Sequence, residues 1–143
     1  MRFRLLLLAP FLLASACSRD ELPAAEAEKG EAVVAGYTAD GRDRMCLSLR
    51  PGGQAGVITY AAGSDSNCSM RGTWSDGAGA AIKPIGDAAC SVPVDSEGDV
   101  VTLGRPSPGC AYYCGPGASL EGKTFTRMEK SEPVTDVAGD PLC

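Results

Sequence analysis

From residue 44 onward the chain alternates between short apolar runs and clusters of Gly, Pro, Asp, Ser and Asn. Short runs at near-regular spacing are typical of strands in an antiparallel meander, because each turn returns the chain to the sheet. The predicted strands lie at 44–50, 56–60, 68–75, 80–85, 90–94, 99–103 and 123–127. The pattern therefore predicts an all-β domain over residues 36–128, folded as a small antiparallel barrel or sandwich.

Alternation within each strand predicts which side chains face the core, since successive residues point to opposite faces of a sheet. The residues expected to face inward are Met45, Leu47, Leu49, Cys68, Met70, Gly72, Trp74, Cys90, Val92 and Val94. Pro84 interrupts the fourth run, which favours an edge strand or a bulge there. Residues 95–98 are expected to turn the chain back after the fifth strand.

Residues 106–119 break the alternating pattern. Cys110 and Cys114 are four positions apart, so a helical turn over 107–114 would place both thiols on one face. Gly115-Pro116-Gly117 would end that turn. Residues 129–143 are expected to form a polar C-terminal tail, anchored only if Cys143 is in a disulfide.

The longest apolar run lies at the N-terminus, from Leu5 to Leu13, and follows the positive charges of Arg2 and Arg4. It is too short to cross a hydrocarbon core, which requires roughly 20 residues. A positive start, a short apolar run and small residues before a cleavage point are typical of a secretory signal peptide. We therefore predict a signal peptide over residues 1–16.

The residues around the predicted cleavage point, Ala14-Ser15-Ala16-Cys17, resemble the lipobox of bacterial lipoproteins, with Ala14 where that family more often has Leu. The resemblance implies that Cys17 becomes the first residue and carries a lipid. In that family a following serine, here Ser18, is compatible with sorting to the outer membrane. The expected location is the periplasmic side of a bacterial membrane; ordinary cleavage, which would release a soluble exported protein, is the alternative.

Residues 17–35 are expected to form a flexible tether after the lipidated cysteine. The stretch 18–31 is acidic, rich in alanine and without aromatic side chains, so it has too little apolar surface to join a core. A partner-binding helix at 24–29 is the alternative reading of this stretch.

The chain has seven cysteines, and lipidation of Cys17 would leave an even number for disulfides. The six disulfide candidates are Cys46, Cys68, Cys90, Cys110, Cys114 and Cys143. With one strand between them, Cys68 and Cys90 would lie roughly 9–10 Å apart, too far for a direct bond. A helical turn carrying Cys110 and Cys114 would bridge to both, which would leave Cys46 for Cys143. Six cysteines allow many other pairings.

Charge and composition exclude several classes of function. Removing residues 1–16 takes away Arg2 and Arg4 and no acidic residue, so the formal net charge falls from −5 to −7. An acidic chain lacks the clustered Lys and Arg that bind nucleic acid. Membrane contact is expected only through the N-terminal lipid, and we expect no cofactor.

The chain has no histidine, which excludes Ser-His and Cys-His nucleophile arrangements and the commonest metal ligand. Asp95, Glu97 and Asp99 place three carboxylates within five residues, a pattern that could form a calcium loop or an acid–base pair. Because the EF-hand pattern is not matched, we interpret them as a solvated hairpin and predict no metal site. The spacing of Cys110 and Cys114 is likewise interpreted as structural rather than redox-active.

The binding candidates are Trp74, Tyr112 and Tyr113, because Trp and Tyr are favoured at interfaces. In the alternative, structural interpretation, one tyrosine packs on the sheet and the other is partly exposed. We therefore predict a non-catalytic, lipid-anchored module that binds a protein or an envelope polymer. A small envelope barrel is similar at the level of fold to lysozyme inhibitors, so an inhibitor is one alternative; a structural envelope component and a carboxylate-dependent hydrolase are the others.

Overall fold

The structure is a computed structural model and describes residues 33–143. The predicted signal peptide, Cys17 and the tether as far as residue 32 lie outside the described residues. The described part contains, in order, β1 (Val34–Thr38), β2 (Arg44–Ser48), β3 (Gln54–Tyr60), β4 (Asn67–Ser75), β5 (Ala81–Pro84), β6 (Val92–Glu97), β7 (Val100–Leu103), the 3-10 helix η1 (Pro108–Tyr113) and β8 (Thr124–Arg127).

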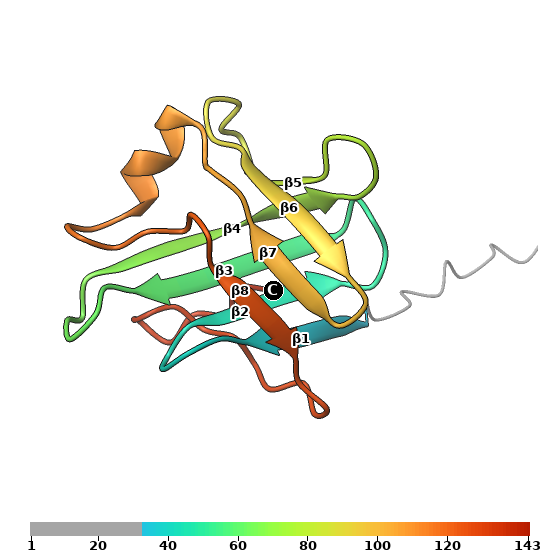
Figure 1. Ribbon diagram of the computed structural model, residues 1–143, viewed down its shortest axis with the longest axis horizontal. Coiled ribbons are helices and arrows are strands. Elements are labelled where there is room, and N and C mark those ends of the chain that lie inside the picture. The colour runs from blue at the N-terminus through green and yellow to red at the C-terminus, as the bar shows by residue number, and fades with distance from the viewer. Residues whose placement is uncertain (1–32) are drawn as a thin grey trace, which may run out of the picture.

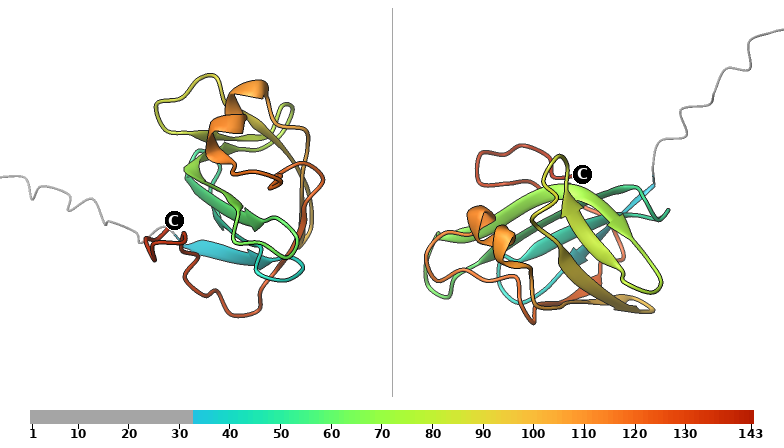
Figure 2. Two further views of the ribbon diagram at one scale, coloured as in Figure 1. Left: turned by 90° about the vertical axis from the view of Figure 1, so that its left-hand side faces the viewer. Right: turned by 90° about the horizontal axis from the view of Figure 1, so that it is seen from above.

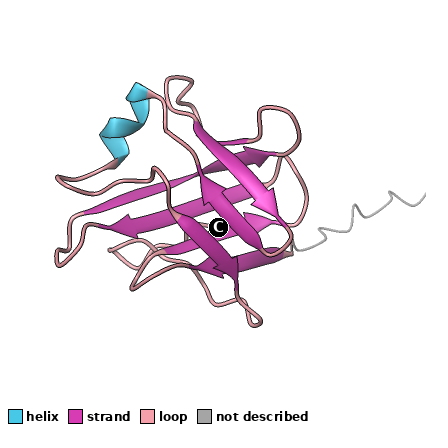
Figure 3. Cartoon of the chain, in the orientation of Figure 1, coloured by secondary structure: helices cyan, strands magenta, loops and turns pink. Residues whose placement is uncertain are grey.

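The strands form a closed antiparallel barrel (Figures 1 and 3). Each strand pairs with the next along the chain, and β8 returns to β1, where Tyr37 lies opposite Arg127 and Thr38 opposite Thr126. Closure pairs both sides of every strand, so the sheet has no free edge to cover. The predicted all-β meander is confirmed, and of the two predicted forms the barrel is the one observed.

Two strand predictions are wrong in detail because of this closure. β5 is not an edge strand: it makes four residue pairs with β4 and two with β6, and Pro84 is its last residue. The strand β1 was not predicted, since Val34–Thr38 is short and has Gly36 at its centre. β1 forms because it pairs along its whole length with β2, and it begins ahead of the predicted domain start at residue 36.

The turn after β6 is shorter than predicted. Residues 95–97 are still in the strand, and Glu97 pairs directly with Val100. Gly98 has a φ of 60°, a left-handed conformation that glycine adopts without steric cost. Gly98 and Asp99 therefore make a two-residue hairpin turn.

The inward faces of all the strands fill the barrel with one hydrophobic core. Its largest fully buried side chains include Phe125 of β8, Met45 of β2 and Leu103 of β7. The predicted inward phase of β4 is confirmed, because Cys68, Met70 and Gly72 are buried while the alternate residues are more exposed. Leu49 is the exception: it lies beyond the end of β2 and is 49% exposed.

The C-terminal segment is not the polar tail expected from its composition. It lies on the outside of the barrel beside β1 (Figure 2). Val134 and Leu142 are buried in a second apolar cluster with Cys46 and Ile58, which face outward from β2 and β3. The segment is therefore a packed part of the domain.

A trough of small residues on the outer face of the sheet accommodates this segment. Gly36, Cys46 and Gly56 lie opposite one another on β1, β2 and β3, and Arg71 of β4 continues the row. Gly36 donates its backbone N–H to the Oγ of Ser131 at 3.1 Å. At the other end of the row a guanidinium N–H of Arg71 donates to the carbonyl of Pro141 at 3.2 Å. We call this row, from Gly36 to Arg71, the trough.

The disulfides have the predicted pairing. Cys46 is bonded to Cys143, Cys68 to Cys114 and Cys90 to Cys110. The first bond holds the end of the C-terminal segment in the trough. The other two tie the segment that carries η1 to β4 and to the residues before β6; the spacing favoured this bridging and left open which of Cys110 and Cys114 joins Cys68.

Candidate binding surface at the loop-bearing end

The longer connections of the barrel gather at one end. Residues 39–43, 61–66, 85–91 and 104–123 lie there, whereas the opposite end carries 49–53, 76–80 and the 98–99 turn. Figure 1 shows this division: η1 and the β3–β4 connection lie at the left, and the β4–β5 and β6–β7 turns at the right. Because functional residues concentrate in loops held by a rigid scaffold, the end with the longer loops is the candidate surface.

The helix η1 is held rigidly at this end. Cys110 on η1 and Cys114 directly after it are both disulfide-bonded, with Cα–Cα distances of 4.5 Å to Cys90 and 3.9 Å to Cys68. Ser107 at its N-terminal side accepts a hydrogen bond from the backbone N–H of Ser91 at 2.9 Å. The side chains carried by η1 therefore have a backbone with little freedom to rearrange.

Tyr112 and Tyr113 of η1 have different environments. Tyr113 packs against the barrel core, and its hydroxyl donates a 2.9 Å hydrogen bond to Oδ2 of Asp87. Tyr112 is 88% exposed and meets Tyr113 edge to face, with ring centroids 5.5 Å apart. Tyr113 therefore packs against the barrel while Tyr112 is exposed, as the structural interpretation predicted. The packed ring of Tyr113 supports the exposed ring of Tyr112.

Hydrogen bonds lower the pKa of Asp87, while burial and a hydrogen bond raise the pKa of Tyr113. The backbone N–H of Ala89 and the hydroxyl of Tyr113 both donate to Asp87, and they lower the pKa of its carboxyl below the usual value. Partial burial, and then the hydrogen bond to Asp87, raise the pKa of the Tyr113 phenol. Between these values the carboxylate and the neutral phenol form a stable donor–acceptor pair.

Trp74 does not join this surface. It is near the end of β4 farthest from Cys68, so at about 3.4 Å per residue the two positions are roughly 20 Å apart. Cys68 is the residue bonded to Cys114 beside the two tyrosines. The indole N–H of Trp74 instead donates to the carbonyl of Ser48 at 3.0 Å, and its ring packs on the core at the opposite end. Of the three binding candidates, Trp74 therefore lies apart from Tyr112 and Tyr113.

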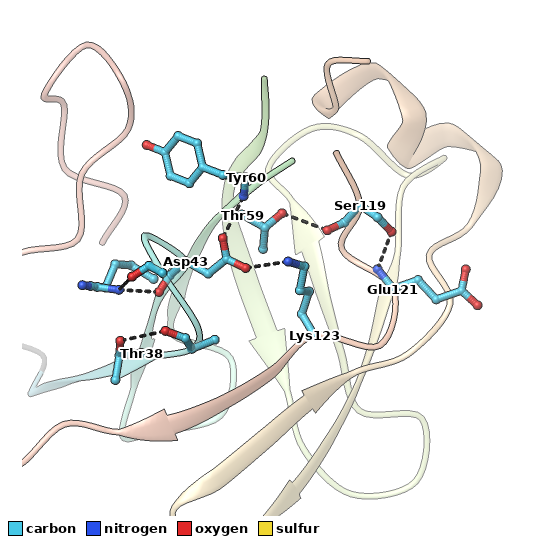
Figure 4. Close-up of polar contacts among 10 residues, drawn as sticks. Thr38, Asp43, Thr59, Tyr60, Ser119, Glu121 and Lys123 are labelled. Carbon is cyan, nitrogen blue, oxygen red and sulfur yellow. Dashed lines mark hydrogen bonds and ion pairs between the residues drawn. The ribbon is translucent and has the colours of Figure 1, made fainter. Parts of the chain in front are cut away.

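An ion pair that the sequence did not predict lies at the same end as η1. Asp43, whose side chain is 6% exposed, accepts a hydrogen bond from the backbone N–H of Tyr60 at 2.8 Å and one from Nζ of Lys123 at 2.6 Å (Figure 4). Asp43 follows Asp40-Gly41-Arg42, which looks like ordinary turn composition. No local pattern distinguishes an acid that turns inward from one in water, so the sequence carried no signal for this pair.

An open groove of about 560 Å³ lies beside this pair, between the β1–β2 and β3–β4 connections. Arg42 crosses it: its guanidinium lies 3.9 Å from the centre of the Tyr60 ring and donates to Asp65 at 2.8 Å and to the carbonyl of Ser64 at 2.7 Å. These contacts, like those of Asp43, connect neighbouring loops. The polar groups of the groove are therefore largely occupied by one another.

Three acidic residues lie on the β6–β7 hairpin, two of them in β6 itself. Asp95, Glu97 and Asp99 are all exposed, and Asp99 lies 3.8 Å from a guanidinium nitrogen of Arg127. Within residues 33–143, no three His, Cys, Asp or Glu side chains are grouped as metal ligands would be.

In the same part of the chain, no helix has both the length and the apolarity needed to span a membrane.

Comparison with known proteins adds no assignment: no family model, no curated protein and no solved structure matches the chain.

Proposed function

We propose that this chain is an exported, lipid-anchored protein of the bacterial cell envelope that binds a protein or an envelope polymer and catalyses no reaction. The three disulfides support export, because disulfides persist in oxidising compartments. They use every cysteine of residues 33–143, and Cys17 is the remaining one of the seven. That leftover thiol, at the lipobox position, supports lipidation of Cys17.

The observation that carries the binding proposal is the exposed ring of Tyr112. An aromatic side chain that is 88% exposed leaves a large apolar surface in water. Its backbone is held by two disulfides and its ring by Tyr113, so little conformational entropy is lost when a partner covers it. Rigid, exposed tyrosines are typical anchors of binding surfaces.

The position of the first strand favours the same surface. The described chain enters the barrel at Val33 and Val34, at the end opposite η1 (Figure 1). A lipid on Cys17 would therefore hold the barrel by the end that lacks η1. Tyr112, at the opposite end, would then be accessible to partners in the periplasm.

The binding proposal is tested by comparing capture of partners with the Tyr112→Ala variant. The full chain, carrying an epitope tag in the exposed Gly98-Asp99 turn, is expressed in a Gram-negative bacterium, cross-linked and recovered. We expect recovery of a specific partner to fall about tenfold in the variant, a loss of roughly 1.4 kcal/mol. Val137→Ala, which truncates another exposed apolar side chain, and Trp74→Phe at the opposite end should leave recovery unchanged. Equal recovery by Tyr112→Ala would contradict the proposal.

Lipidation is tested separately by the intact mass of the mature protein. The wild-type product should begin at Cys17 and carry the added mass of the lipid, and Cys17→Ser should leave the membrane fraction. An unmodified thiol at residue 17 of the wild-type product would refute the anchor without affecting the binding test.

A further inference from the structure

The three disulfides differ in what else holds their two cysteines together. Cys68 and Cys114 also face each other in an isolated antiparallel backbone bridge. Beside them, the backbone N–H of Gly115 donates to the carbonyl of Asn67 at 2.8 Å. If this disulfide were reduced, the folded backbone would therefore keep the two thiols side by side.

The same holds for Cys90 and Cys110. The backbone N–H of Ser107 donates to the carbonyl of Ser91, and the backbone N–H of Ser91 donates to Oγ of Ser107, both at 2.9 Å. Cys68, Cys90 and Cys110 are buried in the barrel core. Two thiols that a fold holds in contact have a high effective concentration, so they re-form their disulfide readily.

The disulfide between Cys46 and Cys143 lies outside that core. Cys143 belongs to the segment 131–143, which packs on the outer face of the barrel (Figure 2). In the described part of the chain, two hydrogen bonds join this segment to the strands, those made by Gly36 and Arg71. The segment is therefore held to the barrel by few polar contacts besides the disulfide.

The segment is also folded on itself, so it can leave the sheet as a unit. The backbone N–H of Leu142 donates to the carbonyl of Val134 at 2.8 Å. The backbone N–H of Asp136 donates to the carbonyl of Asp140 at 2.9 Å. The apolar contact with the sheet is a small cluster in which Val134 and Leu142 lie with Ile58. Once the disulfide is open, this cluster and the two hydrogen bonds are what hold the segment.

A reductant can reach the bond between Cys46 and Cys143. An open groove of about 610 Å³ is lined by both residues, so an attacking thiolate has a path to the sulfurs. A groove of about 410 Å³ likewise adjoins Cys110 and Cys114. Access therefore does not separate the three bonds. The freedom of Cys143 to move away once the bond is broken does.

We propose that the Cys46–Cys143 disulfide is a redox latch and that residues 131–143 are a strap that its reduction releases. A thiolate of a dithiol reductant attacks one sulfur of the bond, which forms a mixed disulfide and frees the other cysteine as a thiolate. The second thiol of the reductant then closes the reductant's own disulfide and frees the first cysteine. Two electrons and two protons pass from the reductant to the two cysteines. The trough is uncovered, while the barrel and its other two disulfides stay closed.

The inference goes beyond the proposed binding function and does not depend on it. The backbone that carries Tyr112 is held by the two disulfides that stay closed, so opening the latch leaves that surface intact. The redox state of one bond would thus control whether a second face of the same barrel, the trough, is covered.

The test is equilibration of the full oxidised chain, in detergent, with mixtures of reduced and oxidised dithiothreitol. Free thiols are alkylated with N-ethylmaleimide and located by peptide mapping. Cys46 and Cys143 should be half labelled at a ratio of reduced to oxidised dithiothreitol about tenfold lower than the other four disulfide cysteines, which corresponds to a potential about 30 mV less negative. In the Cys46→Ala/Cys143→Ala variant the labelling curve of those four should be unchanged.

Release of the strap has its own readouts. At the ratio that opens the latch alone, the Gly36 amide should exchange with deuterium about tenfold faster, because it loses Ser131 as its acceptor. The near-ultraviolet circular dichroism of Trp74 should persist. Leu142→Ala weakens the packing of the strap and should lower the ratio of reduced to oxidised dithiothreitol that opens the latch about tenfold. Val137→Ala, which truncates an exposed side chain of the same segment, is the matched control and should leave that ratio unchanged.

Each of three results overturns the inference. Labelling of all six cysteines at one ratio, or of the core cysteines first, would show that no separate latch exists. Opening of the Cys46–Cys143 bond with unchanged exchange at Gly36 would show that the segment stays in place and is no strap. Equal ratios in Leu142→Ala and Val137→Ala would show that packing on the sheet does not hold the segment. None of these results affects the binding proposal, which the Tyr112→Ala comparison tests separately.

Discussion

Gly56 of β3 lies directly beneath Leu142 of the C-terminal segment: a Cβ atom on Gly56 would stand 2.5 Å from the Leu142 Cβ and 2.6 Å from its carbonyl oxygen. The carbonyl belongs to the backbone, so the segment must shift to make room for any side chain. The contact shows why a segment with few apolar residues is part of the domain. The segment can reach the surface of the sheet because Gly56 has no side chain in the way.

We predict that Gly56→Ala lowers the free energy of unfolding by about 2 kcal/mol, the usual cost of overpacking. Urea unfolding followed by Trp74 fluorescence measures it. The control is the same substitution in a chain that ends at Lys130 and carries Cys46→Ala, where no segment covers Gly56. A similar loss in both backgrounds would mean that contact with Leu142 is not the cause.

The disulfide between Cys46 and Cys143 closes a loop with a sequence separation of 97. Because the loop is long, the Cys46→Ala/Cys143→Ala variant should lose about 4 kcal/mol of stability through the larger entropy of its unfolded chain. The barrel core does not include this bond, so the near-ultraviolet circular dichroism of Trp74 should persist. Trypsin should then cleave after Lys130 faster than in the wild type. Unchanged cleavage would show that packing alone holds the segment.

The pair of Asp43 and Lys123 gives an asymmetric prediction. Lys123→Met leaves a carboxylate whose side chain is 6% exposed without its cation, and should cost about 2 kcal/mol. Asp43→Asn leaves Lys123, which is 32% exposed and able to gain water, so the loss should be nearer 1 kcal/mol. Chemical unfolding of both variants at neutral pH measures the difference. The reverse order would contradict the assigned burial.

The hydrogen bond between Tyr113 and Asp87 predicts how stability changes with pH. The pKa of Asp87 is lowered in the folded chain, so its contribution is complete above the usual value of 3.8 and is lost as the pH falls through the folded pKa. The pKa of Tyr113 is raised, so its contribution is complete below the usual value of 10.0 and is lost as the pH rises through the folded pKa.

Tyr113→Phe should reduce both losses, and carbon-13 titration of the Asp87 carboxyl should show its pKa moving up toward the usual value. Tyr60→Phe alters a tyrosine outside this pair and serves as the control. An Asp87 titration that is the same in wild type and Tyr113→Phe would refute the role of this hydrogen bond.

Several features of the fold follow from local pattern. The alternation in 68–75 predicted the inward faces of Cys68 and Met70, because strand side chains alternate whatever their partner. The same phase, together with the spacing of adjacent strands, favoured the bridging of Cys68 and Cys90 to Cys110 and Cys114 without excluding other pairings. The unpredicted strand β1 shows the limit of this reasoning. Gly36 disfavours a strand locally, and β1 forms because its backbone pairs with β2 along its whole length.

Local patterns along the chain predicted the class of fold and the inward and outward faces of most strands, and they favoured the observed disulfides over other pairings. All of these depend on a period of two and on short-range spacing. The folded structure was needed to show that the sheet closes, that Asp43 meets Lys123, that Leu142 packs on Gly56 and that Trp74 lies far from Tyr112. These contacts join residues distant in sequence, and they exist only once the curvature of the whole sheet has placed one strand beside another.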